Sequence, residues 1–285
     1  MKYSVFSVCT PEYDICDTVQ LLKNLGFDGV EWRVADPPPA AKPADYTFEG
    51  RYWSYNRSTL DISQIEKEAA RIKDICSQAG IEICALATYL GLWDVVDIER
   101  ALNAAQAMEC PSIRVDMPFY DGTENYRSLF SRSAAQVIEL AKLAARYQVR
   151  INFETHMGNI IPSASAAYRL VSGCDPNHIG IIFDPGNMVY EGFENYRLGI
   201  ELLGEYLAHV HVKNSLWQLN GTSDDGVNTW NPTWAPFKKG YADLGNLIQV
   251  LRESNYSGYL SVEDFSNQEE TAAKLKGDLE FLRRL

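Results

Sequence analysis

The feature that most constrains the fold is an apolar pattern that switches repeatedly between strand-like and helix-like periods. The expected strands are Tyr3–Cys9, Gly29–Val34, Ile81–Thr88, Ser112–Met117, Arg150–Thr155, Ile179–Phe183, Ala208–Lys213 and Tyr259–Glu263. The expected helices are Ile15–Leu25, Ile62–Ala79, Asp97–Met108, Tyr126–Tyr147, Ser163–Val171, Asn195–Tyr206, Leu244–Ser254 and about Glu269 to Leu285. Such alternation predicts parallel strands joined by right-handed crossovers. We therefore expect an α/β fold, the (β/α)8 TIM barrel, with an open doubly wound sheet as the alternative.

One domain accounts for the whole chain, residues 1–285. Hydrophobic residues make up 46% of it, enough to bury one large core. No linker rich in glycine, serine or charge separates two parts, so we expect a single domain.

Composition and charge narrow the class of partner. The formal net charge of −12 repels phosphate backbones, so nucleic acid is not expected as a partner. The N-terminus becomes polar too soon for a signal peptide, and no apolar run approaches the roughly 20 residues of a membrane helix. The six scattered cysteines form no CxxC pair, which favours a reducing environment. We expect a soluble cytoplasmic protein.

Two segments after expected strands are longer than simple turns. Asp36–Leu60 is rich in proline and contains Trp53, and Asn214–Tyr241 contains three tryptophans, among them Trp217 and Trp230. In a barrel both lie on the face where the strands end, where long loops shape substrate sites. Surface decoration or an oligomer contact is the alternative for each, and a homo-oligomer is compatible with both.

Four metal-binding side chains end four consecutive expected strands: Glu154, Asp184, His211 and Glu263. In each case an apolar strand leads directly into an ionisable group. Burial of a lone carboxylate at a barrel mouth is costly, and a bound cation offsets that cost for several at once. Three carboxylates and one imidazole suit one divalent ion: Mn2+, Mg2+, Co2+ or Zn2+. A single such residue is more often a solvated strand end, so the prediction depends on the set.

Strand parity adds candidates near the same mouth. His156 lies two residues after Glu154 and Lys213 two residues after His211, so each shares a side with its metal ligand in an extended strand. We expect His156 to bind a substrate hydroxyl or a metal-bound water, and Lys213 to polarise a carbonyl. A structural hydrogen bond and a surface lysine are the respective alternatives.

Further candidates end other strands. Glu31 ends the second strand and Asp116 the fourth, and we expect both to contact substrate. For Glu31 the alternative is an internal ion pair with Arg33. His209 lies deeper in its strand, where a core or supporting role is expected.

Several blocks resemble a known family. FETH, FDPGN, HVHVKN, GYLSVEDF and LGFDGVEWR look like the xylose isomerase-like TIM barrels, the sugar isomerases and epimerases grouped with AP endonuclease family 2. The resemblance covers essentially the whole chain and implies the same four ligands. In the ketose 3-epimerase branch the two metal-bound glutamates also exchange the substrate proton, which implies that role for Glu154 and Glu263.

The chain departs from that branch at two substrate positions. Asn187 stands where the branch often has histidine, and Trp217 where it often has arginine. We expect Asn187 and Trp217 to contact substrate in their place. The DNA-cleaving branch uses three zinc ions and many histidines, whereas this chain has four histidines in all. A trinuclear site is not expected.

The expected chemistry is proton abstraction next to a carbonyl, through a metal-stabilised enediolate, on a sugar or polyol ketone. Return of the proton gives an isomerase or epimerase, which is the first hypothesis. Loss of a hydroxyl gives a dehydratase of inosose or dehydroshikimate type. A non-catalytic carbohydrate-binding barrel is a distant alternative. No GxGxxG or Walker-type loop implies a nucleotide, and no basic cluster marks a phosphate pocket.

Overall fold

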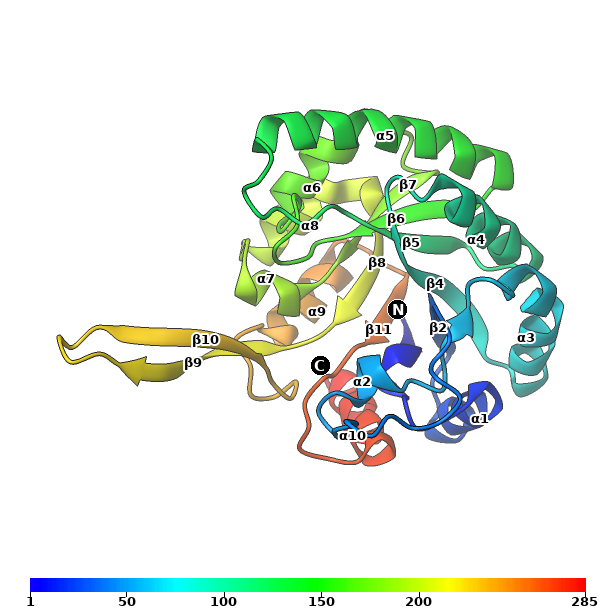
Figure 1. Ribbon diagram of the computed structural model, residues 1–285, viewed down its shortest axis with the longest axis horizontal. Coiled ribbons are helices and arrows are strands. Elements are labelled where there is room, and N and C mark those ends of the chain that lie inside the picture. Colours follow the sequence, from blue (N-terminus) through cyan, green and yellow to red (C-terminus); the bar gives the residue numbers. More distant parts are fainter.

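The chain forms a closed barrel of eight parallel strands (Figure 1). The computed structural model describes residues 1–285. Its barrel strands are β1 (Lys2–Phe6), β2 (Gly29–Ala35), β4 (Glu82–Gly91), β5 (Ser112–Asp116), β6 (Arg150–Glu154), β7 (Ile179–Phe183), β8 (Leu207–Val212) and β11 (Tyr259–Val262). Each pairs in parallel with the next, and β1 pairs with β11, which closes the sheet. The barrel is confirmed, and the open sheet is excluded.

Helices cover the outside of the barrel (Figure 1). The helices between successive barrel strands, and after the last, are α1 (Ile15–Leu25), α3 (Ile65–Ala79), α4 (Val95–Ala107), α5 (Tyr126–Tyr147), α6 (Ala164–Val171), α8 (Tyr196–Leu203), α9 (Leu244–Glu253) and α10 (Thr271–Leu282). Each buries one apolar stripe, such as Val19 and Leu22 of α1. Gly26 and Gly80 end α1 and α3 at positive φ, 86° and 73°, a backbone conformation that glycine adopts without steric cost. None of the helices is apolar over a length that would cross a bilayer.

The first strand is shorter than expected. The prediction of Tyr3–Cys9 as a strand is wrong at its end, because Ser7–Cys9 forms a 3-10 turn. The Ser7 hydroxyl accepts a hydrogen bond from the backbone N–H of Arg33 at 2.8 Å, a tertiary contact that the local pattern does not reveal.

The two long segments contain regular structure. Residues 36–60 hold the short helix α2 (Arg51–Ser54) and the start of the two-residue strand β3 (Leu60–Asp61). The segment after β8 is an antiparallel hairpin of β9 (Ser215–Thr222) and β10 (Asn228–Trp234), which projects from the barrel (Figure 1). A further short helix, α7 (Pro185–Tyr190), follows β7 directly.

Candidate metal centre and the cavity above it

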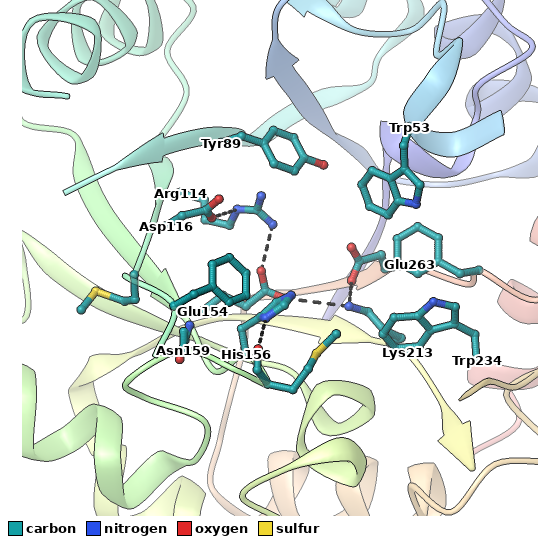
Figure 2. A pocket seen from close by; sticks show the side chains of 14 residues that line it. Trp53, Tyr89, Arg114, Asp116, Glu154, His156, Asn159, Lys213, Trp234 and Glu263 are labelled. Atoms are coloured by element: carbon teal, nitrogen blue, oxygen red, sulfur yellow. Dashed lines mark hydrogen bonds and ion pairs between the residues drawn. The ribbon is translucent and has the colours of Figure 1, made fainter. Parts of the chain in front are cut away.

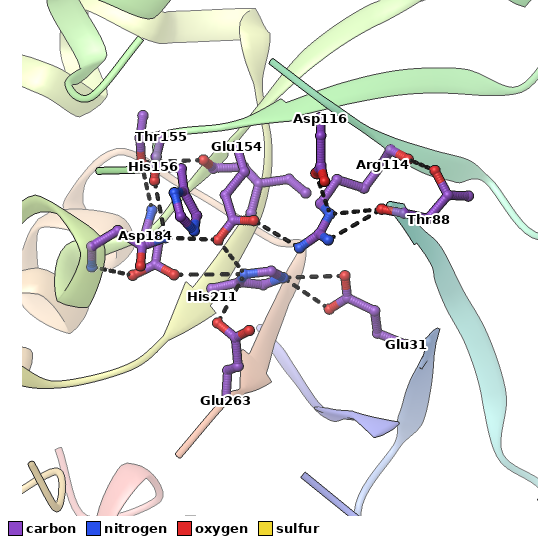
Figure 3. A network of polar contacts seen from close by, with 12 residues as sticks. Glu31, Thr88, Arg114, Asp116, Glu154, Thr155, His156, Asp184, His211 and Glu263 are labelled. Atoms are coloured by element: carbon purple, nitrogen blue, oxygen red, sulfur yellow. Dashed lines mark hydrogen bonds and ion pairs between the residues drawn. The ribbon is translucent and has the colours of Figure 1, made fainter. Parts of the chain in front are cut away.

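Four side chains from neighbouring strands converge at the barrel mouth (Figure 3). Glu154 ends β6, Asp184 follows β7, His211 lies near the end of β8 and Glu263 follows β11. One ligand atom from each lies within 4.8 Å of those of the others, and all four residues are buried. Since β6, β7, β8 and β11 are consecutive around the barrel, parallel register brings their ends to one place.

This set of donor atoms fits a divalent cation. Asp184 Oδ2 and Glu263 Oε2 are buried, and the one cationic side chain that faces both is Lys213. Three carboxylates around one point are costly to bury unless further positive charge balances them. Carboxylate oxygens together with one imidazole nitrogen are donors that Mn2+, Mg2+, Co2+ and Zn2+ accept.

The imidazole of His211 is oriented with one nitrogen toward the acids. Its Nδ1 lies 3.1 Å from Glu154 Oε1, 3.4 Å from Glu263 Oε2 and 3.7 Å from Asp184 Oδ2. Its Nε2 lies 3.1 Å from both oxygens of Glu31. Burial alone would lower the pKa of His211, but the carboxylates on both sides raise it well above its usual value.

Glu31 supports His211 from below rather than lining the cavity. It is fully buried and accepts hydrogen bonds from Ser261 Oγ at 2.6 Å and from the rings of His209 and His211 at 3.1 Å. Burial alone would raise the pKa of Glu31, but the two histidines lower it well below its usual range. A Glu31 carboxylate therefore favours His211 with a proton on Nε2, which leaves Nδ1 for a metal.

Glu154 has partners on both of its oxygens. Arg114 Nη1 donates to Oε2 at 2.8 Å (Figure 3). Asn187 Nδ2 donates to Oε1 at 2.9 Å. Burial alone would raise the pKa of Glu154, but His211 and Arg114 lower it well below its usual range. This carboxylate is therefore held in one orientation and in its charged form.

Lys213 places a positive charge among the acids. Its Nζ lies 2.5 Å from Glu263 Oε2 and 2.8 Å from Asp184 Oδ2, and donates to Asn187 Oδ1 at 3.0 Å. Burial alone would lower the pKa of Lys213, but Asp184 and Glu263 raise it. Lys213 and Arg114 together offset two of the three negative charges of Glu154, Asp184 and Glu263, and the remaining negative charge favours a further cation.

A cavity of about 230 Å³ opens above the acids (Figure 2). Polar groups, including Glu154, Glu263 and Lys213, lie on part of its wall. Aromatic rings make up much of the rest: Trp53, Tyr89, Phe119, Trp234 and Phe265. Such rings offer flat apolar faces to the C–H groups of a small polar molecule.

The candidate residues fall into three groups by position. His156 and Asp116 line the cavity together with Lys213. Asp184 and Asn187 are buried behind it, and Asn187 contacts Glu154 and Lys213. The structure does not bring Glu31 or Trp217 to the cavity wall.

Trp217 lies at the base of the hairpin and faces α7. Its indole N–H donates to the carbonyl oxygen of Val189 at 2.9 Å. Trp230 lies farther out on the hairpin and is exposed, whereas Trp234 lines the cavity and stacks on Tyr190. Of Trp53, Trp217 and Trp230, the tryptophans of the two long segments named from the sequence, the structure places only Trp53 at the cavity.

Sequence reasoning missed Arg114. Arg114 lies two residues before Asp116 on β5, so it shares a side of the strand with that candidate, and the parity argument applied to His156 and Lys213 would have pointed to it. It contacts Asp116 at 3.3 Å and donates to the carbonyl oxygen of Thr88 from Nη2 at 3.1 Å, besides holding Glu154. Tyr89 and Phe265 were also missed, and no local pattern distinguishes them from core aromatics.

Comparisons with known proteins agree with this architecture. The sequence pattern of a family described as "Xylose isomerase-like TIM barrel" matches residues 19–285. An inosose dehydratase of Clostridium botulinum (strain Eklund 17B / Type B) is 27% identical over 161 residues, or 53% of this chain and 52% of the relative. The chain thus matches about half the length of that relative.

Two solved structures share the fold. A 3-keto-D-glucoside 4-epimerase from E. coli has a TM-score of 0.73 and 18% identity, with 100% of both chains covered. The IOLI protein, solved with a zinc atom, has a TM-score of 0.71 and 15% identity, with 100% of this chain and 99% of that chain covered. At these identities the likeness concerns the fold.

Proposed function

The chain belongs to the xylose isomerase-like TIM barrel family, and on that premise we propose that it is a divalent-metal-dependent sugar isomerase or epimerase. It removes a proton from the carbon next to a carbonyl of a sugar or related polyol ketone and returns it. The observation that carries the proposal is the convergence of Glu154, Asp184, His211 and Glu263 below one cavity.

One divalent ion, Mn2+, Mg2+, Co2+ or Zn2+, would be held by these four side chains. When bound, it acts as a Lewis acid that acidifies the C–H bond beside a carbonyl. The zinc in the related IOLI structure supports a metal in this fold. Proton transfer and substrate binding are then carried out by side chains of the protein.

Glu263 is the residue best placed to take the proton. It lines the cavity, and the Lys213 ammonium group contacts one of its oxygens, Oε2, at 2.5 Å. Glu154 also reaches the cavity, but Arg114 and Asn187 engage both of its oxygens. We therefore assign removal of the proton to Glu263. In an isomerase the same residue returns it, and in an epimerase Glu154, which Arg114 and Asn187 orient, returns it on the opposite face of the substrate.

The cavity wall supplies substrate contacts. Lys213 donates a charged hydrogen bond suited to a carbonyl or enolate oxygen. His156 and Asp116 lie near the mouth, where their side chains can bind hydroxyl groups. The charges of Arg114 and Lys213 are balanced by carboxylates, which disfavours the additional negative charge of a phosphate group and favours an unphosphorylated substrate.

Dehydration is the second candidate. The resemblance to an inosose dehydratase favours it, as does the engagement of both Glu154 oxygens, because elimination needs one base rather than two. Glu263 then takes the proton, and Lys213 or His156 protonates the departing hydroxyl group.

The test uses ketoses, inososes and keto acids with the Mn2+-loaded protein in deuterated water. We expect solvent deuterium in a product or in recovered substrate, and its loss with Glu263→Gln. Glu82→Gln, an exposed glutamate at the opposite end of the barrel, is the matched control and should exchange normally.

A product lighter by one water assigns the dehydratase, and a product of unchanged mass assigns the isomerase or epimerase. Full exchange by Glu263→Gln contradicts the assigned base, and no exchange with any substrate class contradicts the proposed chemistry.

A further inference from the structure

Lys274 is a lysine buried on an outer helix, α10, with 4% of its surface exposed. Its ammonium group donates to the carbonyl oxygen of Asp264 at 2.5 Å, to that of Ser266 at 3.1 Å and to the Tyr52 hydroxyl at 2.8 Å. The nearest carboxylate oxygen, Asp264 Oδ1, is 3.9 Å away. An ammonium group is costly to bury, and an apolar side chain of similar length would pack here without that cost. The lysine therefore differs from a packing residue in the three oxygens that it holds.

Two of these oxygens flank Phe265. Asp264 and Ser266 are its neighbours in the chain, and the Phe265 ring lines the cavity. This stretch follows β11 and belongs to no helix or strand, and neither carbonyl oxygen accepts a backbone hydrogen bond. The other side-chain donors to the two oxygens are more distant, at 3.3 and 3.6 Å. Lys274 thus fixes the backbone before and after Phe265, and with it the direction of the ring.

The third oxygen connects the segment that carries Trp53. Tyr52 lies on α2, and the next residue, Trp53, lies on the cavity wall (Figure 2). The centroid of the Phe265 ring is 5.1 Å from that of Tyr52 and 5.2 Å from that of Trp53. One ammonium group therefore joins two segments, far apart in the sequence, that supply neighbouring parts of one wall.

We propose that Lys274 is a positioning residue for the substrate, which acts through Phe265 and Trp53. Flat apolar ring faces bind the C–H groups of a sugar or polyol well only while their orientation is fixed. Lys274 fixes it from outside the cavity, whose wall it does not reach. The inference rests on the proposed function, because it assigns the two rings to substrate.

Glu263 is held by other contacts, although it lies just before this stretch. Its backbone N–H donates to the carbonyl oxygen of Val212 at 3.0 Å, and its side chain contacts Lys213. Loss of the Lys274 ammonium group should therefore disturb the aromatic wall and leave the metal-binding residues in place. In kinetic terms KM rises and kcat is kept, because contacts with the rings hold the ground state and the transition state equally.

The first test compares Lys274→Met with Lys276→Met, which removes an exposed lysine of the same helix. The substrate is the one identified by deuterium exchange. We expect Lys274→Met to raise KM about tenfold, the size of one aromatic contact, and to change kcat by less than about twofold. Mn2+ affinity, measured by calorimetry, should equal that of the wild type in both variants. An unchanged KM, or a loss confined to kcat or to Mn2+ affinity, overturns the proposal.

Chemical rescue separates the ammonium group from general stability. Lys274→Ala removes the atoms of propylammonium, and a cavity of about 130 Å³ lined by Lys274 gives that ion a way in. We expect propylammonium to restore the KM of Lys274→Ala, and tetramethylammonium, which has a charge but no N–H donor, to leave it raised. Preparation of the variant in propylammonium also covers a failure of the empty site to fold. Equal effects of the two ions overturn the role of the hydrogen bonds.

A signal from the ring itself needs no substrate. With 4-fluorophenylalanine in place of Phe265 and Mg2+ present, the full chain should give one narrow fluorine resonance, and so should Lys276→Met. Lys274→Met should give several resonances or a broadened one, and a single unchanged resonance there overturns the positioning role. A wild-type protein that shows this difference but turns over no substrate would refute the proposed function and not the fixation of Phe265 by Lys274.

Discussion

The Lys213 ammonium group lies among the carboxylates of the candidate metal centre and should therefore lower its affinity for a metal ion. The ammonium group contacts Asp184 and Glu263, two of the residues that would hold a metal. Unit charges 4 Å apart interact by about 4 kcal/mol at an effective dielectric constant of 20, so the lysine opposes a second cation. Lys213→Met should therefore bind Mn2+ at least about tenfold more tightly by calorimetry, while turnover falls.

Lys239→Met, an exposed lysine outside the cavity, should leave the Mn2+ affinity unchanged. Weaker Mn2+ binding by Lys213→Met would contradict the competition and would mean that the lysine assists the metal.

Glu31 acts on the metal centre through His211. Its carboxylate accepts the hydrogen bond from Nε2 and so fixes the nitrogen that faces the acids. Loss of such a supporting carboxylate lowers metal affinity by about 10–100-fold in related arrangements. We expect that loss in Glu31→Gln, measured by calorimetry with Mn2+, with Glu82→Gln as the control. Unchanged affinity would assign Glu31 to barrel stability alone.

The sequence predicted individual residues where a strand runs directly into them. The four metal-binding candidates could be selected because each follows an apolar strand, and in a parallel barrel all strands end at the same rim: Glu154, Asp184, His211 and Glu263. Glu31 was predicted at the substrate because its strand also ends there, but its side chain turns beneath His211. Neither the orientation of the Glu31 side chain nor the contact between Arg114 and Glu154 can be predicted from the spacing of residues along the sequence.

At the scale of elements, the hairpin shows where pattern reading fails. Pro232 lies inside β10, and a proline in the sequence argues against a strand at that position. A bulge next to Trp230 also interrupts the pairing, so the strand is irregular. Trp217 and Trp234 lie on the same face of the hairpin, two residues apart in register. Trp234 and not Trp217 lines the cavity, an outcome that depends on how the hairpin leaves the barrel rather than on residue type.

The last helix, α10, contains a buried acid whose charge state affects stability. Burial, and next the negative charge of Asp264, raise the pKa of Asp278 to about 8, although Lys274 opposes them. In the unfolded chain an aspartate titrates near 3.9. The folded chain therefore binds the extra proton between about pH 4 and pH 8, and the free energy of unfolding falls as pH rises through that window.

Replacement of this acid should remove its share of that pH dependence. Asp278→Asn cannot ionise, so we expect its free energy of unfolding to exceed that of the wild type by at least about 1 kcal/mol at pH 8.5. At pH 5 the two should be similar. Urea unfolding at both pH values measures this, with exposed Asp74→Asn as the control. A variant less stable than the wild type at pH 8.5 would mean that the Asp278 carboxylate is stabilising.

At the scale of the whole molecule, eight strands alternating with eight helices predicted the closed barrel, but the alternation alone did not exclude an open sheet. Closure depends on the pairing of β1 with β11, residues more than 250 positions apart such as Val5 and Val262. No local pattern specifies that register. The barrel in turn explains the site, because closure brings the ends of β6, β7, β8 and β11 around one cavity.

The most direct test of the account is a crystal of the protein soaked in Mn2+ and measured for anomalous scattering. We predict one manganese peak in each copy, in contact with Glu154, Asp184, Glu263 and Nδ1 of His211. A cluster that holds no peak, or a peak bound elsewhere, would contradict the metal centre and with it the proposed proton-transfer chemistry.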